Sequence, residues 1–201
     1  MIRDGKLTED NEKMLLELRA VEDYIKLKYP NRKLEIVDCD PNAGEAWDYN
    51  SWLVVDTGEE QGSEPSYVQA TLQEDGKYTI VDNFYSKDFN QKATEALADI
   101  LKQGGIPFVD AQARFGAYLG QDKGLNMNTN DLLTGAVPAE GTYLIFLDED
   151  GLGHGSYEDN YKEIREYLSS KGLKGWCSIV ILEDKDADRT KGRLFSKGFS
   201  L

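Results

Sequence analysis

The sequence has few of the residues that crosslink small domains or bind metals. Its 201 residues include two cysteines, Cys39 and Cys177, and one histidine, His154. These numbers exclude a disulfide scaffold, a four-cysteine zinc site and any site that needs two imidazoles. Both cysteines fall in runs typical of strands, LEIVDC and WCSIVIL, where a thiol is most often a small buried apolar group. A mutual disulfide and a reactive thiol are the alternatives.

Catalytic motifs are equally scarce. No G-x-S-x-G, H-E-x-x-H or C-x-x-C pattern occurs. His154 stands between two glycines, which is typical of a solvated loop, with a catalytic pairing to Cys177 or Asp150 as the alternative. The Asp-Thr-Gly triplet at 56–58 resembles that of aspartic proteases, but no second copy supplies the partner carboxylate. We therefore predict a protein that is not an enzyme.

Long apolar runs are absent too. No stretch of 18 apolar residues exists, so no membrane-spanning helix is expected. The opening sequence, MIRDGKLTEDNEK, lacks the apolar core of a signal peptide. The expected location is the cytoplasm for the chain as given, or the cell envelope if the chain is the mature part of an exported protein.

Basic residues are missing from one long segment. Between Leu34 and Gly76 there are eleven Asp or Glu residues and no Lys or Arg. The whole chain has 37 acidic and 23 basic side chains, a net charge of −14. Such a surface repels nucleic-acid phosphates and anionic lipids, so neither is an expected partner. It favours a protein partner, and a basic one in particular.

The same segment contains the aromatic run AWDYNSW. Trp and Tyr dominate binding hot spots because they bury a large area with little loss of entropy. The polar residues between these rings predict that part of the run is exposed. The sequence therefore predicts a recognition surface formed by Glu45, Trp47, Asp48, Tyr49, Trp52, Glu59 and Glu60.

The periodicity of apolar residues predicts an α+β fold in which three helices pack on antiparallel sheet, in the order α-ββββ-α-ββ-α-ββ. Apolar residues at three- and four-residue steps predict a first helix near Asn11–Tyr29, ended by Pro30. Four alternating segments then predict an antiparallel meander with a hairpin turn at Asp75-Gly76. Residues 1–86 are the predicted first domain.

Residues 87–201 form the predicted second half, unless residues 1–201 are one continuous domain. Asp88 or Asn90 is expected to cap its first helix, and Ser156 its second. The longest alternating run predicts a strand over Val109–Leu119, and residues 121–135 are expected to be loop with one helical turn near Asp131. Three further strands are predicted, at Tyr143–Leu147, Trp176–Leu182 and Arg193–Phe199.

The segment LDEDGLGHGSYED, residues 147–159, partly fits a calcium-binding loop of the EF-hand type. Four oxygen-bearing residues fall at ligand positions of that loop, namely Asp148, Asp150, Ser156 and Asp159. Leu152 occupies a position where an oxygen ligand belongs. The alternative is a glycine-rich connection in which Ser156 and Asp159 form a capping box for the next helix. No other cofactor is expected.

Two short motifs carry a resemblance. They are the end of the first helix, Lys28-Tyr29-Pro30, and the strand end Asp82-Asn83-Phe84 within QEDGKYTIVDNFYS. Residues 11–103 resemble uncharacterised, often lipid-anchored proteins of Gram-positive gut bacteria, with Pro30 where those proteins have glycine. The helix and meander are also similar to a cystatin-type topology. The resemblance implies a fold and an envelope location, and it implies no reaction.

The function that the sequence favours is a non-catalytic, protein-binding module that uses an acidic, aromatic surface. Besides a hydrolase, whose pocket the sequence does not define, two alternatives remain. One is an immunity or inhibitor protein that neutralises a basic toxin or enzyme. The other is a calcium-binding envelope module that uses the 148–159 loop.

Overall fold

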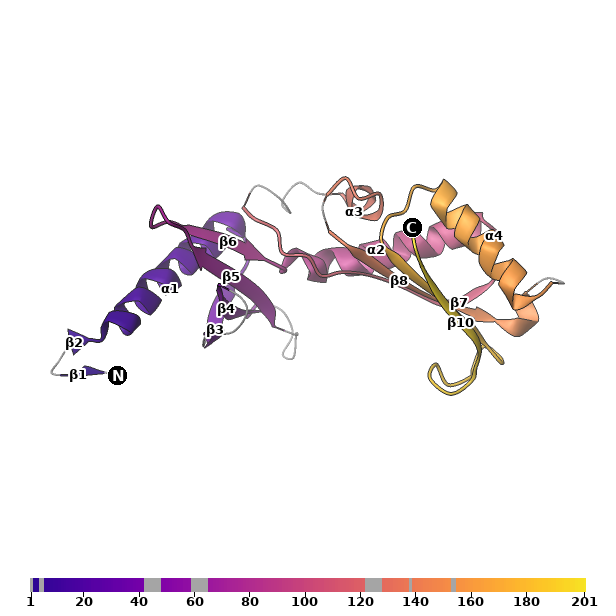
Figure 1. The fold of residues 1–201 in the computed structure, drawn as a ribbon, viewed down its shortest axis with the longest axis horizontal. Coiled ribbons are helices and arrows are strands. Elements are labelled where there is room, and N and C mark those ends of the chain that lie inside the picture. The colour runs from indigo at the N-terminus through magenta and orange to yellow at the C-terminus, as the bar shows by residue number, and fades with distance from the viewer. Residues whose placement is uncertain are drawn as a thin grey trace. The chain divides into compact units, whose positions relative to one another are not determined.

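The computed structural model describes residues 2–3, 6–41, 48–58, 65–121, 128–137, 139–152 and 155–201. Within those residues the chain divides into two compact units that contain four α-helices and ten strands (Figure 1). The first unit comprises Met1–Tyr85 and Tyr118–Asn126, and the second comprises Ser86–Ala117 and Met127–Leu201. The α+β class is confirmed, with four helices rather than three in the described part of the chain.

The first unit packs one long helix, α1 (Glu9–Lys28), on a four-stranded sheet. Thr8 begins the helix by accepting a hydrogen bond from the amide of Asn11, and the helix ends two residues before Pro30. The sheet is the expected antiparallel meander, in the order β3-β4-β5-β6. Its strands are β3 (Leu34–Asp40), β4 (Asn50–Asp56), β5 (Ser66–Leu72) and β6 (Tyr78–Asp82), preceded by the short pair β1 (Ile2–Arg3) and β2 (Lys6–Leu7).

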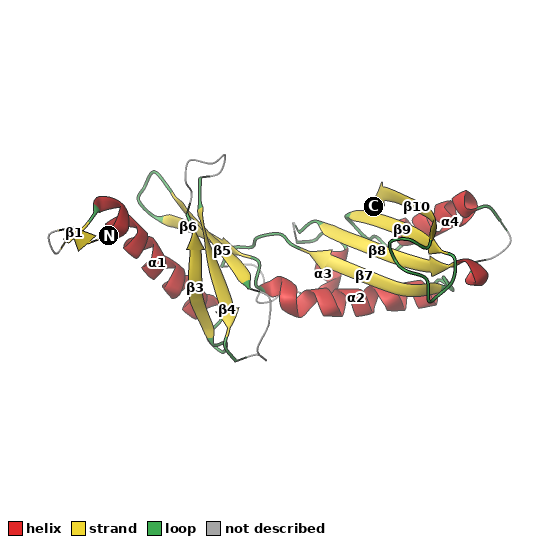
Figure 2. Ribbon diagram, turned by 90° about the horizontal axis from the view of Figure 1, so that it is seen from below, coloured by secondary structure: helices red, strands yellow, loops and turns green. Residues whose placement is uncertain are grey.

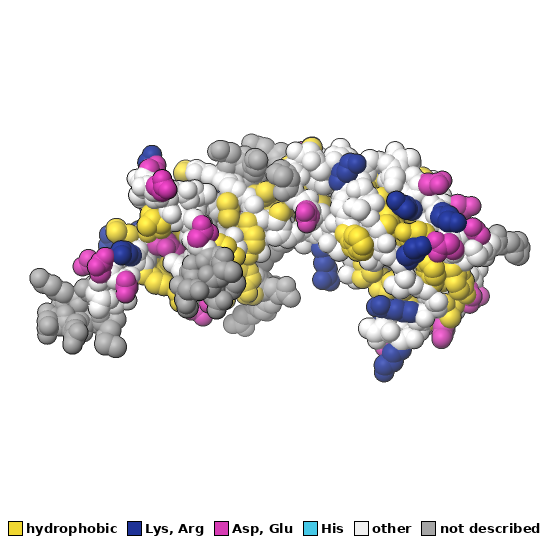
Figure 3. Space-filling model, viewed as in Figure 1, with side chains coloured by type: hydrophobic (Ala, Val, Ile, Leu, Met, Phe, Trp, Pro, Cys, Tyr) yellow, Lys and Arg dark blue, Asp and Glu magenta, His cyan; other side chains and the backbone are white. Residues whose placement is uncertain are grey.

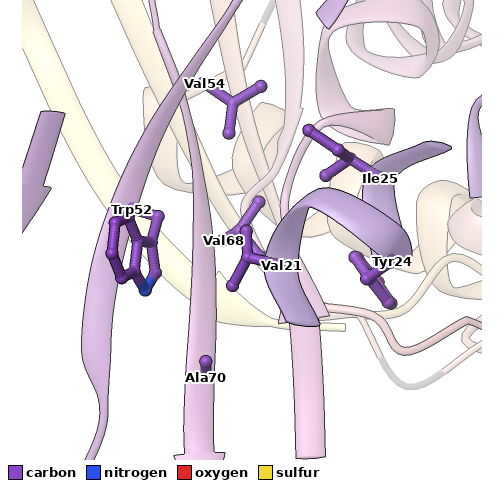
Figure 4. Packing of buried hydrophobic residues seen from close by; sticks show 7 residues of the cluster. All are labelled: Val21, Tyr24, Ile25, Trp52, Val54, Val68 and Ala70. Carbon is purple, nitrogen blue, oxygen red and sulfur yellow. The ribbon is translucent and has the colours of Figure 1, made fainter. Parts of the chain in front are cut away.

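Alternation along the strands places one set of side chains against α1 (Figure 4). Val54 and Val68 are 1% exposed, and Val21 of the helix is fully buried. The core cluster consists of Val21, Tyr24, Ile25, Trp52, Val54, Val68 and Ala70. The neighbouring residues in β4 and β5 therefore lie on the opposite face of the sheet.

The second unit is a four-stranded sheet in the order β10-β9-β8-β7, with two long helices on one face (Figure 2). The helices contact each other, since the Tyr167 hydroxyl donates to the Ile100 carbonyl over 2.8 Å. Tyr161 packs edge-on against Phe199 of the sheet. The elements are α2 (Tyr85–Gln103), β7 (Phe108–Phe115), α3 (Thr129–Leu133), β8 (Gly141–Asp148), the 3-10 turn η1 (Glu149–Gly151), α4 (Tyr157–Ser170), β9 (Trp176–Leu182) and β10 (Arg193–Ser200).

The expectation of purely antiparallel sheet is wrong for the second unit. β8 and β9 run parallel, with Tyr143 opposite Cys177 and Leu147 opposite Ile181. The cause is α4, which carries the chain back along the sheet, so that the next strand starts from the same end as β8. The other pairs, β7 with β8 and β9 with β10, are antiparallel.

The predicted strand over Val109–Leu119 is too long. β7 ends at Phe115, and Leu119 belongs to the first unit, where it forms an isolated bridge with Asp82. Leu119 N donates to Asp82 O over 2.8 Å, and Asp82 N donates to Leu119 O over 3.1 Å. The alternating pattern thus continues beyond the end of β7 to Leu119, which pairs with the sheet of the first unit.

The expected cap of the second helix is also wrong. α2 begins at Tyr85, so Asp88 and Asn90 lie inside the helix. The side chain of Asn90 has another role, since its Oδ1 accepts a hydrogen bond from the amide of Phe115 over 2.8 Å. The contact ties the end of β7 to α2.

Candidate protein-binding surface

The sheet of the first unit has one face that α1 does not cover. Trp52, Val54 and Val68 point to the helix, so their neighbours along each strand point away from it. We call this second set the acidic sheet face. Its residues are Glu35, Asp38 and Asp40 of β3, Ser51, Leu53 and Val55 of β4, Tyr67, Gln69 and Thr71 of β5, and Thr79 and Val81 of β6.

The charge on this face is concentrated on β3, which is an edge strand. Glu35, Asp38 and Asp40 are all exposed. Leu53 pairs with Asp38 on one side and with Tyr67 on the other. A carboxylate, an apolar side chain and an aromatic ring therefore lie in one row across three strands.

The tyrosine of this row, Tyr67, lies near two others, Tyr49 and Tyr118. Tyr67 is 36% exposed, and the half-buried Tyr118 lies close to Tyr67, Tyr49 and Gln69. Burial raises the pKa of Tyr118, the hydroxyls of Tyr49 and Tyr67 raise it further, and the Gln69 side chain acts in the opposite direction. The cluster offers hydroxyls beside apolar ring surface.

Apolar side chains are exposed on the same unit. Val37 is 56% exposed where a register shift interrupts the pairing of β3 with β4. Figure 3 shows acidic side chains spread over the first unit, with apolar side chains exposed between them. A surface that combines aromatic rings, apolar contact area and carboxylates of one sign can bind a protein whose surface is basic.

The predicted recognition residues are divided by the structure. Trp52 does not belong to the surface, since it is 4% exposed and packs under α1. Its indole Nε1 donates to Glu17 Oε1 over 2.7 Å, a contact that the polar sequence around it does not reveal. Asp48 is exposed and Tyr49 is half-buried beside Tyr118. Glu45, Trp47, Glu59 and Glu60 lie outside the described residues.

Five residues of this surface are not among the recognition residues predicted from the sequence, namely Glu35, Asp38, Asp40, Tyr67 and Tyr118. The first four could be found from the alternation of LEIVDCD and SYVQATL, once the face that α1 covers is known. Tyr118 could not, because it lies 36 residues beyond Asp82, the last residue of the sheet, and reaches the sheet through the Leu119 bridge.

The two motifs that carry the resemblance meet in a buried polar network. Lys28 and Asp82 are fully buried, and Lys28 Nζ lies 2.6 Å from Asp82 Oδ2. The same ammonium donates to the Leu119 carbonyl over 2.9 Å and to the Tyr24 hydroxyl over 3.0 Å. Burial lowers the pKa of Lys28, and the contact with Asp82 opposes that change.

The Asp82 carboxylate is held by several further donors. The Tyr24 hydroxyl donates to Oδ2 over 2.5 Å, and the Tyr29 hydroxyl donates to Oδ1 over 2.7 Å. The backbone amide of Phe84 also donates to Oδ1, over 2.9 Å. Burial and the neighbouring carboxylate raise the pKa of Tyr24, so that it keeps its proton and remains a donor. The Lys28–Asp82 pair at its centre is fully buried, and the network joins α1, β6 and the 118–120 segment, which makes it structural.

No protein-family model matches the chain, and no curated protein matches it. Among solved structures, the chain is similar to a crystal structure of a DUF5037 family protein from Ruminococcus gnavus. The sequence identity is 10% and the TM-score is 0.38, over 92% of this chain and 90% of the other. A likeness at this level carries no argument about function.

Three of the four predicted calcium ligands, Asp148, Ser156 and Asp159, take part in helix caps. Ser156 Oγ accepts a hydrogen bond from the amide of Asp159, and the Asp159 carboxylate accepts one from the amide of Ser156. Asp148 Oδ1 similarly accepts from the amide of Asp150, which is exposed. Throughout the described ranges, no group of three or more His, Cys, Asp or Glu side chains could hold a metal ion. Gly153 and His154 lie outside those ranges.

We expect Ser156→Ala to lower the free energy of unfolding by about 1 kcal/mol, because it removes one half of the capping box. Ser169→Ala, in the last turn of the same helix, is the matched control and should change stability by less than about 0.5 kcal/mol. Urea denaturation measures both. Calcium at millimolar concentration should leave Tm unchanged, and a rise in Tm that Asp159→Asn abolishes would instead establish a calcium site.

The two cysteines, both in described strands, are free thiols. Burial raises the pKa of Cys177 to about 12. Burial and the nearby carboxylates of Glu17, Asp38 and Asp40 raise that of Cys39 to about 11. Neither thiol therefore has the lowered pKa of a reactive cysteine. Within the described residues, no helix combines the length and the apolar character needed to cross a bilayer.

Proposed function

We propose that this protein is a non-catalytic binding module that recognises a basic protein through the acidic sheet face. The observation that carries the proposal is the row of carboxylates on β3 beside the Tyr49, Tyr67 and Tyr118 cluster. The first unit contains 20 acidic and 10 basic residues of the sequence, and the second unit contains 17 acidic and 13 basic residues. The attraction for a basic partner is thus strongest on the unit that presents the tyrosines.

The two parts of the surface have different roles in this proposal. Exposed carboxylates attract an oppositely charged partner over a distance and raise the association rate. Aromatic rings that become buried in the contact hold the partner and lower the dissociation rate. An immunity or inhibitor protein that neutralises a basic toxin or enzyme is the specialised form of this function.

We also propose that the first half has the cystatin-like topology implied by the resemblance and that the protein is located in the cell envelope. The two motifs of the resemblance meet in one network, in which Lys28 and Tyr29 contact Asp82 and the amide of Phe84 donates to the same carboxylate. The motif residues therefore define one structural unit of the first half.

The test begins with affinity purification on the intact protein, compared with a variant that carries Glu35→Gln, Asp38→Asn and Asp40→Asn and with Tyr67→Ala. A partner that both variants fail to retain is then purified for kinetics. We expect the charge variant to reduce the association rate by on the order of tenfold at low salt. Tyr67→Ala should instead increase the dissociation rate, by roughly tenfold for an anchor worth 1.4 kcal/mol.

The matched control neutralises exposed acids of the second unit, with Asp184→Asn and Asp186→Asn. This control should bind like the wild type. Association that does not slow with added salt would contradict the electrostatic part of the proposal, since exposed charges are screened within about 10 Å at 0.1 M salt. Full retention of every partner by the Tyr67→Ala variant would contradict the choice of surface.

A further inference from the structure

A separate cavity in the second unit lies where β8 and β9 begin. It has a volume of about 580 Å³, which is in the range of small-molecule sites. Trp176, the first residue of β9, lines it and is 52% exposed. A tryptophan this open on a sheet is the kind of side chain that contacts a ligand, because its ring offers apolar area and its N–H a donor.

The indole of Trp176 packs on the neighbouring strand. It lies against Gly198 of the neighbouring strand, where a Cβ added to the glycine would come within 2.5 Å of the ring. Glycine at 198 thus leaves room for the ring to lie on the backbone of β10. Because the ring packs against Gly198 and the side chain is 52% exposed, a flat apolar surface can stack on the exposed part of the ring.

Hydrogen bonds hold the backbone of residues that line the cavity. Gly175 has φ +131°, and a Cβ there would lie 2.2 Å from the Gly141 carbonyl oxygen, so this position requires glycine. Lys174 N donates to the Leu133 carbonyl over 2.8 Å, and the Tyr143 hydroxyl donates to the Lys174 carbonyl over 2.9 Å. These contacts preform the site before any ligand arrives.

The polar groups around the ring decide the ligand class. The charged residues that line the cavity are one base, Lys174, and one acid, Glu140, so it has no net attraction for an ion. The hydroxyls of Thr142 and Ser200 can each donate and accept hydrogen bonds. A saccharide matches this set, since a pyranose has an apolar C–H face for the ring and hydroxyls that need both donors and acceptors.

We propose that this cavity binds a neutral saccharide, a hexose or an N-acetylhexosamine unit, with one sugar face stacked on Trp176. The site is independent of the acidic sheet face and lies on the other unit. It requires no covalent step.

The test follows the indole N–H signals in a ¹⁵N-correlated NMR spectrum. The sequence has three tryptophans, and Trp176→Phe identifies the Trp176 signal. Glucose, galactose, N-acetylglucosamine and chitotriose are titrated to about 50 mM, which would saturate a site with a millimolar Kd. We expect at least one of them to shift the Trp176 signal in a saturable way and to leave that of the buried Trp52 unchanged.

Trp176→Ala should weaken binding at least about tenfold, and Thr142→Val, at an exposed position, about fivefold because one hydroxyl contact is lost. The second variant keeps the ring, so it tests the site even if the first does not fold. Glu74→Gln, at an exposed position on the first unit, should bind the sugar like the wild type. The absence of a saturable shift with all four sugars overturns the proposal, as does a shift caused only by a lysine- or arginine-containing peptide.

Discussion

Lys28→Met is expected to lower the free energy of unfolding of the first unit by about 3–5 kcal/mol, the range for removing one partner of a buried ion pair. The ammonium of Lys28 is fully buried and has three acceptors, Asp82 Oδ2, the Leu119 carbonyl and the Tyr24 hydroxyl. Methionine fills a similar volume but leaves the Asp82 carboxylate without its counter-charge. Urea denaturation measures the loss, with amide hydrogen exchange in β4–β6 assigning it to the first unit.

Lys26→Met is the matched control, two residues earlier on the same helix. Lys26 forms an exposed pair with Glu22 over 3.4 Å, and its side chain is 70% exposed, so its replacement should change stability by less than about 0.5 kcal/mol. The double variant Lys28→Met with Asp82→Asn should lose less than the sum of the two single variants, since no uncompensated charge remains. Strict additivity would show that the two groups do not depend on each other.

The first unit could be predicted largely from local pattern. Pro30 marks the end of α1, and the Asp75-Gly76 turn joins β5 to β6, as expected. These features depend on residues that are adjacent in sequence. The alternation of apolar and polar residues also predicted that each strand has two different faces. One strand alone does not indicate which face α1 covers.

What could not be predicted depends on contacts between distant residues. The alternating run after Val109 gives no sign that Leu119 leaves β7 to pair with Asp82, because the pattern is the same for either sheet. The parallel register of β8 and β9 likewise follows from the path of α4 across the sheet. Trp176 was predicted correctly as the start of a strand, but the position of its ring depends on the absence of a side chain at Gly198 of the neighbouring strand.

The candidate surface likewise could not be predicted from local sequence, because it depends on contacts between distant residues. AWDYNSW predicts exposure from composition, yet its last residue is the first buried side chain of β4 that packs under the helix. The residues that replace it on the surface come from β3, β5 and the 118–120 segment. A recognition surface on a sheet is assembled by register, and register is fixed by the fold as a whole.

Trp52→Ala tests that assignment directly and is expected to cost about 3–5 kcal/mol of stability, as for other large aromatic side chains removed from a core. The indole is 4% exposed, and its Nε1 donates to Glu17, a buried carboxylate that also accepts from the Asn50 side chain. Removing the ring creates a cavity and takes one donor from a buried charge. Trp52→Phe keeps most of the ring and should lose less, about 1–3 kcal/mol, chiefly for the missing hydrogen bond.

Tyr67→Ala is the control on the opposite face of the same sheet. It should lower stability by less than about 1 kcal/mol, because Tyr67 is 36% exposed and lies outside the core cluster. The two positions thus separate folding from recognition: Trp52 variants should change stability at unchanged affinity per folded molecule, and Tyr67 variants the reverse. A Trp52→Ala protein that keeps wild-type stability and loses its partner would place Trp52 in the interface and overturn the assignment of faces.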